Sequence, residues 1–187
     1  MRQYLSSLPE SVMSAPRWWV ALSGGADSVA LLHALAAFAA EQPTPAIHVI
    51  HVNHHLHPEA GEWSQLCQRH ADALRVPLVI ADCEVESSGR GLEADARRER
   101  YSAFEQVLEL HEVLFTAHHT DDQVETVLLR LLRGAGPRGL AGIPEQRRCG
   151  KGHLFRPFLQ VSSTTLRAAV ETAGLEHVRD PSNFEVK

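Results

Sequence analysis

Ser23-Gly24-Gly25-Ala26-Asp27-Ser28 stands between an apolar run, residues 18–22, and a run of helical character that begins at residue 28. A strand, a glycine turn and a helix N-terminus in this order form an anion site, because free backbone N–H groups and the helix dipole converge there. The glycines let the backbone approach a phosphate closely and adopt positive φ. The two serines add hydroxyl donors, and Ser28 is a good helix cap. The stretch therefore predicts a phosphate-binding loop.

Asp27 is the unusual member of this stretch, since a carboxylate repels a phosphate. A Mg²⁺ ion bound between the two groups would remove the conflict. The alternative is a plain serine–glycine turn at a helix cap. The strand before the stretch and the helix after it favour the phosphate loop, because that motif requires this context.

Segments of strand and helix character alternate along the whole chain. The expected strands are residues 18–22, 47–53, 78–81, 113–117 and 154–158, and the expected helices are residues 28–40, 61–74, 92–110, 120–133 and 163–173. This order predicts a doubly wound α/β fold, with a mostly parallel five-stranded sheet and helices on both faces. Ligands of such sheets bind at the carboxyl ends of the strands. We expect one domain over residues 1–187, in which residues 134–152 form a long, flexible, basic loop.

Composition limits the class of protein. The chain has 187 residues, of which 44% are hydrophobic and 22% charged, enough for one well-buried domain. No apolar run approaches the roughly 20 residues that span a bilayer, and the N-terminus lacks the pattern of a secretory signal. The three cysteines, Cys67, Cys83 and Cys149, have no C-x-x-C spacing. They disfavour a disulfide framework or a zinc site and fit the reducing cytoplasm.

Charge is distributed unevenly. The net charge of −5 disfavours nucleic-acid binding by the chain as a whole. Residues 130–156, however, carry seven basic residues and one acidic residue, so this segment is +6 and the remainder is −11. A basic strip on an acidic body can follow a phosphate backbone. A solvated basic loop is the equally weighted alternative.

A second polar group follows the fourth expected strand, in Ala117-His118-His119-Thr120-Asp121-Asp122-Gln123-Val124-Glu125-Thr126. Thr120 and Gln123 have the spacing of a capping box, which would start the helix. The helix would then bury an apolar stripe of Val124, Val127, Leu128, Leu131 and Leu132. Two adjacent acids, a third one turn later and two histidines exceed what capping needs. They indicate a site for a metal ion or a cationic substrate.

Together these motifs resemble the tRNA(Ile)-lysidine synthetase family of the PP-loop ATP pyrophosphatase superfamily. The first stretch resembles the S-G-G-x-D-S PP-loop, and residues 118–126 resemble the family's H-x-x-D-D-Q-x-E-T block. Similar segments are residues 51–54, 93–101, 132–140, 156–157 and 180–183. The PP-loop alone is shared with GMP, NAD and asparagine synthetases, so the ordered set of motifs carries the resemblance.

The resemblance implies a C–N-bond-forming ligase. ATP would adenylate the C2 oxygen of the wobble cytidine in an isoleucine tRNA with a CAU anticodon. The ε-amine of free L-lysine would then attack C2 and displace AMP, which leaves lysidine. ATP and Mg²⁺ are the implied cofactors, and the cytoplasm is the implied location.

The resemblance also implies roles for residues. ATP would be bound by Ser23, Gly24, Gly25, Ala26, Asp27, Ser28, His51 and Asn53. Catalysis would use Asp27, Asp122, Arg97 and His118, with Asp27 and Asp122 as the Mg²⁺ ligands. Lysine would be bound by Asp122, Glu125, Arg97 and Arg100. The tRNA would be bound by Arg133, Arg138, Arg147, Arg148 and Lys151.

Two other functions stay open. A tRNA thiolase of the same superfamily is disfavoured, because thiolases related to the 2-thiocytidine enzymes carry C-x-x-C pairs. A nucleotide-binding module without turnover is the second, since members of the family continue beyond the segment that residues 180–183 resemble into further tRNA-binding domains. We therefore expect ATP–Mg²⁺ binding and weak tRNA binding. We interpret the histidines of residues 51–57 as solvated loop residues rather than a zinc site, and a homodimer stays open.

Overall fold

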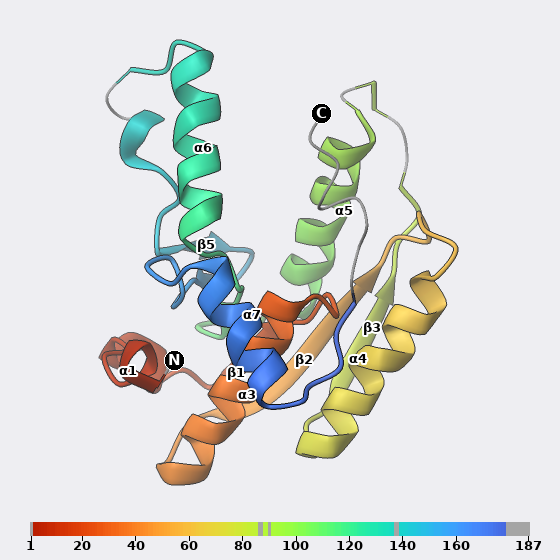
Figure 1. Ribbon diagram of the computed structural model, residues 1–187, viewed down its shortest axis with the longest axis vertical. Helices are drawn as coiled ribbons and strands as arrows, with labels where there is room; N and C mark the ends of the chain where they lie inside the picture. The colour runs from red at the N-terminus through yellow and green to blue at the C-terminus, as the bar shows by residue number, and fades with distance from the viewer. Residues whose placement is uncertain (1, 86–87, 90, 137–138, 179–187) are drawn as a thin grey trace.

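The protein is represented by a computed structural model, which describes residues 2–85, 88–89, 91–136 and 139–178. Within these residues one sheet contains β1 (Arg17–Ala21), β2 (Ala46–Asn53), β3 (Leu78–Asp82), β4 (Val113–Phe115), β5 (Gln146–Cys149) and β6 (Gly152–Phe155). The strand order is β3-β2-β1-β4-β6-β5, and every neighbouring pair is parallel except β5 with β6 (Figure 1). The expected mostly parallel α/β sheet is confirmed, but it has six strands rather than five.

The additional strand, β5, lies inside residues 134–152, which the sequence predicted to be a flexible loop. It pairs antiparallel with β6 from Gln146 opposite Phe155 to Cys149 opposite Gly152. Only Cys149 of its four residues is buried. An edge strand of this kind is held by backbone pairing more than by apolar side chains, so its polar sequence hid it. A short 3-10 helix, η1 (Gly139–Ala141), occupies another part of the same segment.

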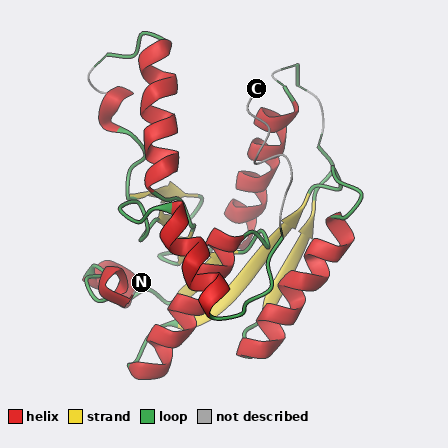
Figure 2. Cartoon of the chain, in the orientation of Figure 1, coloured by secondary structure: helices red, strands yellow, loops and turns green. Residues whose placement is uncertain are grey.

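Helices cover both faces of the sheet, as expected (Figure 2). They are α1 (Arg2–Leu5), α2 (Glu10–Met13), α3 (Ala26–Glu41), α4 (Ala60–Leu74), α5 (Leu92–Val107), α6 (Thr120–Leu132) and α7 (Ser163–Thr172). Alternate residues of β1 point to opposite faces. Trp18 packs edge-on against Phe115 in the core beneath α3, while Trp19 belongs to the core on the α5 side. Both tryptophans are therefore packing residues.

Helix α6 differs from the prediction. None of its residues is buried, and Val124, Leu128, Leu131 and Leu132 are 52%, 52%, 55% and 83% exposed. The helix begins at the carboxyl rim of the sheet and leads away from the body, beside the segment that carries η1 (Figure 1). Periodicity predicted an amphipathic stripe correctly, but a stripe does not establish that another element covers it. None of the described helices is both long and apolar enough to cross a membrane.

Candidate active site

The phosphate loop, residues 23–28, connects β1 to α3 at the carboxyl rim of the sheet. Gly24 has a φ of 87°, which residues with a side chain rarely adopt. A Cβ atom at this position would lie 3.0 Å from Cγ2 of Val178. Helix α3 begins at Ala26 with Gly25 as its N-cap residue. The first backbone N–H groups of a long helix therefore face the loop, in agreement with an anion site.

The two serine hydroxyl groups hold this loop together. Ser28 Oγ accepts from the Ser23 backbone N–H at 3.1 Å and donates to the Gly25 carbonyl oxygen at 2.9 Å. Ser23 Oγ lies 3.1 Å from Ser28 Oγ and accepts from the Gly25 N–H at 3.3 Å. Ser28 is thus the third residue of the helix and not its cap. Its hydroxyl shapes the loop from within.

Asp27 and Asp122 lie on either side of one histidine. His119 Nε2 is 3.5 Å from Asp27 Oδ2, and His119 Nδ1 is 3.4 Å from Asp122 Oδ2. The other oxygen of Asp27, Oδ1, is buried and has no hydrogen-bond partner in the described structure. The two motifs that the sequence singled out are therefore parts of one site.

Burial opposes protonation of His119, but the hydrogen bond with Asp27 and the charges of Asp122, Asp27 and Asp121 outweigh it and raise the pKa. The imidazolium form is favoured because it neutralises acids that face each other across the ring. In the described part of the chain, no three His, Cys, Asp or Glu side chains are grouped as a complete metal site. A divalent ion here would need oxygen atoms from a ligand as well as from Asp27 and Asp122, which is the usual situation for Mg²⁺.

The start of α6 has a different cap from the predicted one. His119 is the N-cap residue, and its backbone N–H donates to Asp122 Oδ2 at 2.7 Å, which completes a capping box with Asp122. Gln123 instead exchanges two hydrogen bonds with the backbone of Ile143 and so fixes the segment beside η1. The Thr120–Gln123 box was therefore wrong. Serine and threonine are the usual capping residues, and an N-cap histidine is not part of that sequence pattern.

The adjacent acids Asp121 and Asp122 have separate tasks. Asp121 Oδ2 accepts from the Ser163 backbone N–H, the first of α7, at 3.0 Å. Hydrogen bonding to Ser163 lowers the pKa of Asp121. Asp121 thus joins the starts of two helices. Both acids lie near His119 Nδ1, Asp122 Oδ2 at 3.4 Å and Asp121 Oδ2 at 3.7 Å.

His118 lies next to a group of arginines. Burial, followed by the charges of Arg156, Arg97, His119 and Arg100, lowers its pKa to about 3. Its Nδ1 is 2.9 Å from the Thr116 hydroxyl oxygen. His118 is therefore neutral at physiological pH, and it can offer or accept a hydrogen bond but cannot supply a positive charge.

The end of β2 supplies three polar side chains. His51 is buried, and its Nδ1–H donates to the Leu22 carbonyl oxygen at 2.8 Å, directly before the phosphate loop. Asn53 Oδ1 accepts from the His55 backbone N–H at 3.0 Å. His54 has two buried ring nitrogens, and neither has a partner in the described structure. Its orphaned nitrogens make His54 a site candidate that the sequence had assigned to solvent.

The predicted lysine-binding residues come from two elements. Glu125 is exposed and lies one turn after Asp122 on α6, so the two carboxylates share a helix face. Arg97 and Arg100 are exposed on α5, and their charges reach His118. The two arginines thus lie near His118, while the two carboxylates lie on the first turns of α6.

The predicted tRNA-binding residues do not form one continuous strip. Arg133 is exposed directly after α6, and Arg147 and Arg148 are exposed on β5. Lys151 lies in the β5–β6 turn, at the amino ends of the parallel strands, whereas the phosphate loop lies at their carboxyl ends. Lys151 Nζ pairs with Glu109 Oε2 at 2.9 Å. Arg138 lies outside the described residues. The antiparallel direction of β5 thus separates Lys151 from Arg147.

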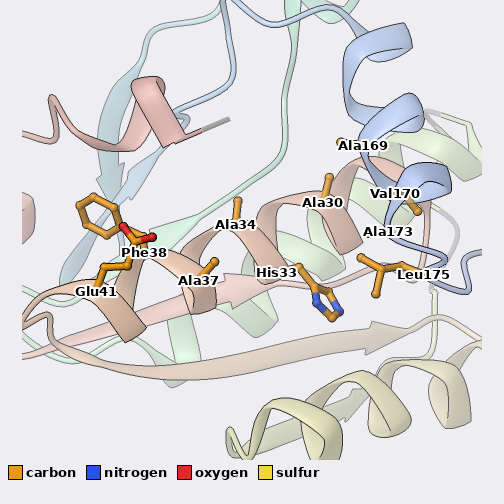
Figure 3. A pocket seen from close by; sticks show the side chains of 10 residues that line it. All are labelled: Ala30, His33, Ala34, Ala37, Phe38, Glu41, Ala169, Val170, Ala173 and Leu175. Atoms are coloured by element: carbon orange, nitrogen blue, oxygen red, sulfur yellow. The ribbon is translucent and has the colours of Figure 1, made fainter.

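The segment after α7 contacts the phosphate loop. The Val178 backbone N–H donates to the Gly24 carbonyl oxygen at 2.9 Å. Glu176 is held by Arg69 at 3.0 Å and, through its carbonyl oxygen, by His70 Nε2 at 2.8 Å. We call residues 174–178 the strap. Nearby, α3 and α7 border a groove lined mainly by alanine and aliphatic side chains, and none of the predicted site residues lines it (Figure 3).

The sequence of the chain matches the model of a known protein family. The family model described as the PP-loop domain matches residues 1–187. The chain belongs to the PP-loop family. The fold expected from the sequence is the fold of this family. Residues 23–28 are the stretch that resembles the family's PP-loop in sequence, and we call them the PP-loop.

Curated relatives of this PP-loop domain carry a common name. The chain is 46% identical over 175 residues to the tRNA(Ile)-lysidine synthase of Pseudomonas putida, covering 94% of this chain and 41% of that protein. It is 49% identical over 173 residues to the protein of the same name from Alkalilimnicola ehrlichii, covering 92% and 39%. The chain thus spans about two fifths of the length of these relatives.

Solved structures agree on the fold. The U34-tRNA thiolase NcsA from Methanococcus maripaludis superimposes with a TM-score of 0.74 at 15% identity, over 100% of this chain and 67% of that one. The NMN synthetase from Francisella tularensis gives 0.58 at 12% identity, over 97% and 70%. At these identities the likeness concerns the PP-loop fold alone.

Proposed function

We propose that this PP-loop domain catalyses the ATP-dependent formation of lysidine on the wobble cytidine of a CAU-anticodon isoleucine tRNA, in the cytoplasm. The observation that carries the proposal is the bridge Asp27–His119–Asp122, which joins the PP-loop to the acidic start of α6. A nucleotide phosphate at the PP-loop and a second substrate at α6 would then meet within one site. The relatives named tRNA(Ile)-lysidine synthase support this choice of reaction.

Asp27 and Asp122 would hold Mg²⁺ together with phosphate oxygens. Their donors are hard oxygens, and Asp27 Oδ1 is buried without a partner, as a group awaiting a cation would be. The ion would supply charge neutralisation between the carboxylates and the nucleotide. The PP-loop itself would cradle the phosphate with the backbone N–H groups at the start of α3, while Ser23 and Ser28 keep the loop in shape.

Lysine would bind through opposite charges on α6 and α5. The carboxylates of Asp122 and Glu125 suit an ammonium group, and Arg100 suits a carboxylate group. For the bond to form, the lysine Nζ must lose its proton, attack C2 of the cytidine and displace AMP. Neutral His118 would hydrogen-bond a substrate there without repelling the amine, and His54 would hydrogen-bond the nucleotide.

The thiolase alternative fits this chain less well. Burial raises the pKa of Cys67 to about 12 and also raises the pKa of Cys149. A buried, protonated thiol is a poor sulfur carrier, because the thiolate is the reactive form. A domain that binds ATP without turnover stays the second candidate, since the relatives are more than twice as long.

The deciding experiment measures pyrophosphate and AMP release from labelled ATP, with and without lysine and a CAU-anticodon isoleucine tRNA. We expect release that requires both substrates. The D122N variant should lose that release, whereas D121N, changed at the neighbouring acid that caps α7, should retain most of it. ATP binding without any cleavage by the wild-type chain, at every tRNA concentration, would contradict the proposal.

A further inference from the structure

Three arginines converge on one tyrosine beside the active site. Arg97 Nη2 lies 3.4 Å from the Tyr101 hydroxyl, one turn away on α5. The guanidinium carbon of Arg147, on β5, lies 4.4 Å from the centre of the Tyr101 ring. Arg156 lies close enough for its charge to act on the Tyr101 phenol, as do the charges of Arg97 and Arg147. We call Arg97, Tyr101, Arg147 and Arg156 the Tyr101 cluster.

Arg156 is the buried member of this cluster. It follows β6 and is only 2% exposed. Its Nη1 donates to the Pro144 carbonyl oxygen at 2.6 Å, which ties it to the chain entering β5. Its Nε is buried and has no hydrogen-bond partner in the described structure. A buried guanidinium with an unused donor is costly unless an acceptor arrives.

The positive charge of the cluster is not balanced. Arg98, on the same helix as Arg97, pairs with Asp95 and Glu99 at 2.8 and 2.9 Å. Within the described chain, no carboxylate forms an ion pair with Arg97, Arg147 or Arg156. Burial favours the neutral form of Tyr101, yet the three arginines outweigh it and lower the pKa of the phenol. Three guanidinium groups around a phenol thus create a strong positive potential.

We propose that the Tyr101 cluster binds a backbone phosphate of an RNA substrate. Arginine matches phosphate with two parallel N–H donors, and aromatic stacking holds the guanidinium plane in place. The cluster opens to solvent through Arg97 and Arg147, which are exposed. Arg97 would thereby serve the RNA rather than the lysine carboxylate. This inference rests on the proposed function, because it places part of that substrate.

The position of the cluster separates it from the nucleotide. Arg156 follows β6, and the PP-loop follows β1, with β4 between them. Two strand spacings amount to about 10 Å, so an anion here is distinct from the phosphate held by the PP-loop. His118 follows β4, the strand between β1 and β6, and lies near Arg97 and Arg156. An RNA phosphate at Tyr101 would therefore direct a base toward His118 and the PP-loop.

The test compares two neighbouring arginines of β5. Arg147 faces Tyr101, and Arg148, the next residue, points to the opposite face of the same strand. R147A and R148A remove the same charge from positions that are both exposed. We would measure binding of a labelled 17-nucleotide anticodon stem-loop with a CAU anticodon to the whole chain by fluorescence anisotropy, from 50 to 200 mM salt.

We expect R147A to weaken RNA binding roughly tenfold at low salt and to reduce the slope of log affinity against log salt by about 1. R148A should weaken it less than threefold. R147K should retain the salt slope but not the full affinity, because an ammonium group lacks the planar fork. Y101F should also weaken binding, since it removes the hydroxyl that accepts from Arg97 Nη2.

Several results would overturn the assignment. Equal losses for R147A and R148A would indicate a general charge effect. A raised KM for lysine in R147A, with RNA affinity unchanged, would assign the cluster to the amino-acid carboxylate. If pyrophosphate displaces bound ATP from the wild type but not from Y101F, while RNA affinity is the same in both, the Tyr101 cluster would be assigned to the nucleotide. Failure of the proposed function is distinguishable, because the wild-type chain would then bind RNA in this assay without releasing pyrophosphate.

Discussion

Replacement of Gly24 by alanine isolates the contribution of the PP-loop backbone to stability. Gly24 has a φ of 87°, and a left-handed backbone costs an L-residue about 1–2 kcal/mol. The new methyl group would lie 3.0 Å from Cγ2 of Val178, and relief of such a contact adds on the order of 1 kcal/mol. We therefore expect G24A to lower the free energy of unfolding by about 2–3 kcal/mol. For a domain of this size the melting temperature should fall by roughly 4–12 °C.

The matched control is G25A. Gly25 has a φ of −68°, and the nearest side-chain atom to a Cβ there, Ser23 Oγ, is at an ordinary 3.5 Å. This variant should change stability by less than about 1 kcal/mol. Urea denaturation of G24A, G25A, V178A and the double variant G24A/V178A measures both parts. The double variant should recover the share due to Val178, about 1 kcal/mol, and leave the share due to φ. Equal stability of G24A and G25A would refute the reasoning.

Three further predictions concern the site and α6. The pKa of His119 is raised above its ordinary 6.5, so its stabilising interactions with Asp27 and Asp122 are fully present below pH 6.5 and are lost as the pH rises through the raised value. The difference in unfolding free energy between wild type and H119Q, measured by urea unfolding from pH 6 to 9, should therefore shrink as the pH rises. A constant difference would contradict the ion pairing. The pKa of His118 is lowered to about 3 in the folded chain, so His118 takes up a proton first in the unfolded chain as the pH falls below 6.5. The free energy of unfolding should therefore decline toward pH 3, and H118N should flatten this decline in the same titration. Leu132 is 83% exposed, so L132Q should alter the free energy of unfolding by no more than about 0.5 kcal/mol, whereas L166Q, at a fully buried position of α7, should unfold the chain at much lower urea; a large loss in L132Q would mean that α6 is covered.

The sequence predicted most of the parallel sheet, because each of those strands is an apolar run between helices of clear character. It also predicted that Asp27 and Asp122 would come together, since both follow strands that end at the same rim. What it missed depends on tertiary contacts. The pairing of β5 is a backbone property, and its residues Gln146, Arg147 and Arg148 resemble a loop. The exposure of Leu128 and Leu132 follows from the direction of α6, which no periodicity encodes.

The polar details of the site were harder still. Thr120 and Gln123 match a capping box in sequence, yet Gln123 is drawn to the backbone of Ile143, twenty residues away. His54 resembled a solvated histidine, because neighbouring histidines and a proline mark a loop. Only the packed structure places its ring nitrogens out of reach of water.

The strap gives the PP-loop a second point of control. Because Val178 bonds to Gly24 while Arg69 and His70 hold Glu176, a displacement of residues 174–178 pulls on the carbonyl of the residue that sets the turn. The reverse also holds, since a nucleotide that stiffens the turn must slow the opening of that bond. The amide hydrogen of Val178 is therefore a built-in reporter, whose exchange with deuterated solvent records the occupancy of the nucleotide site.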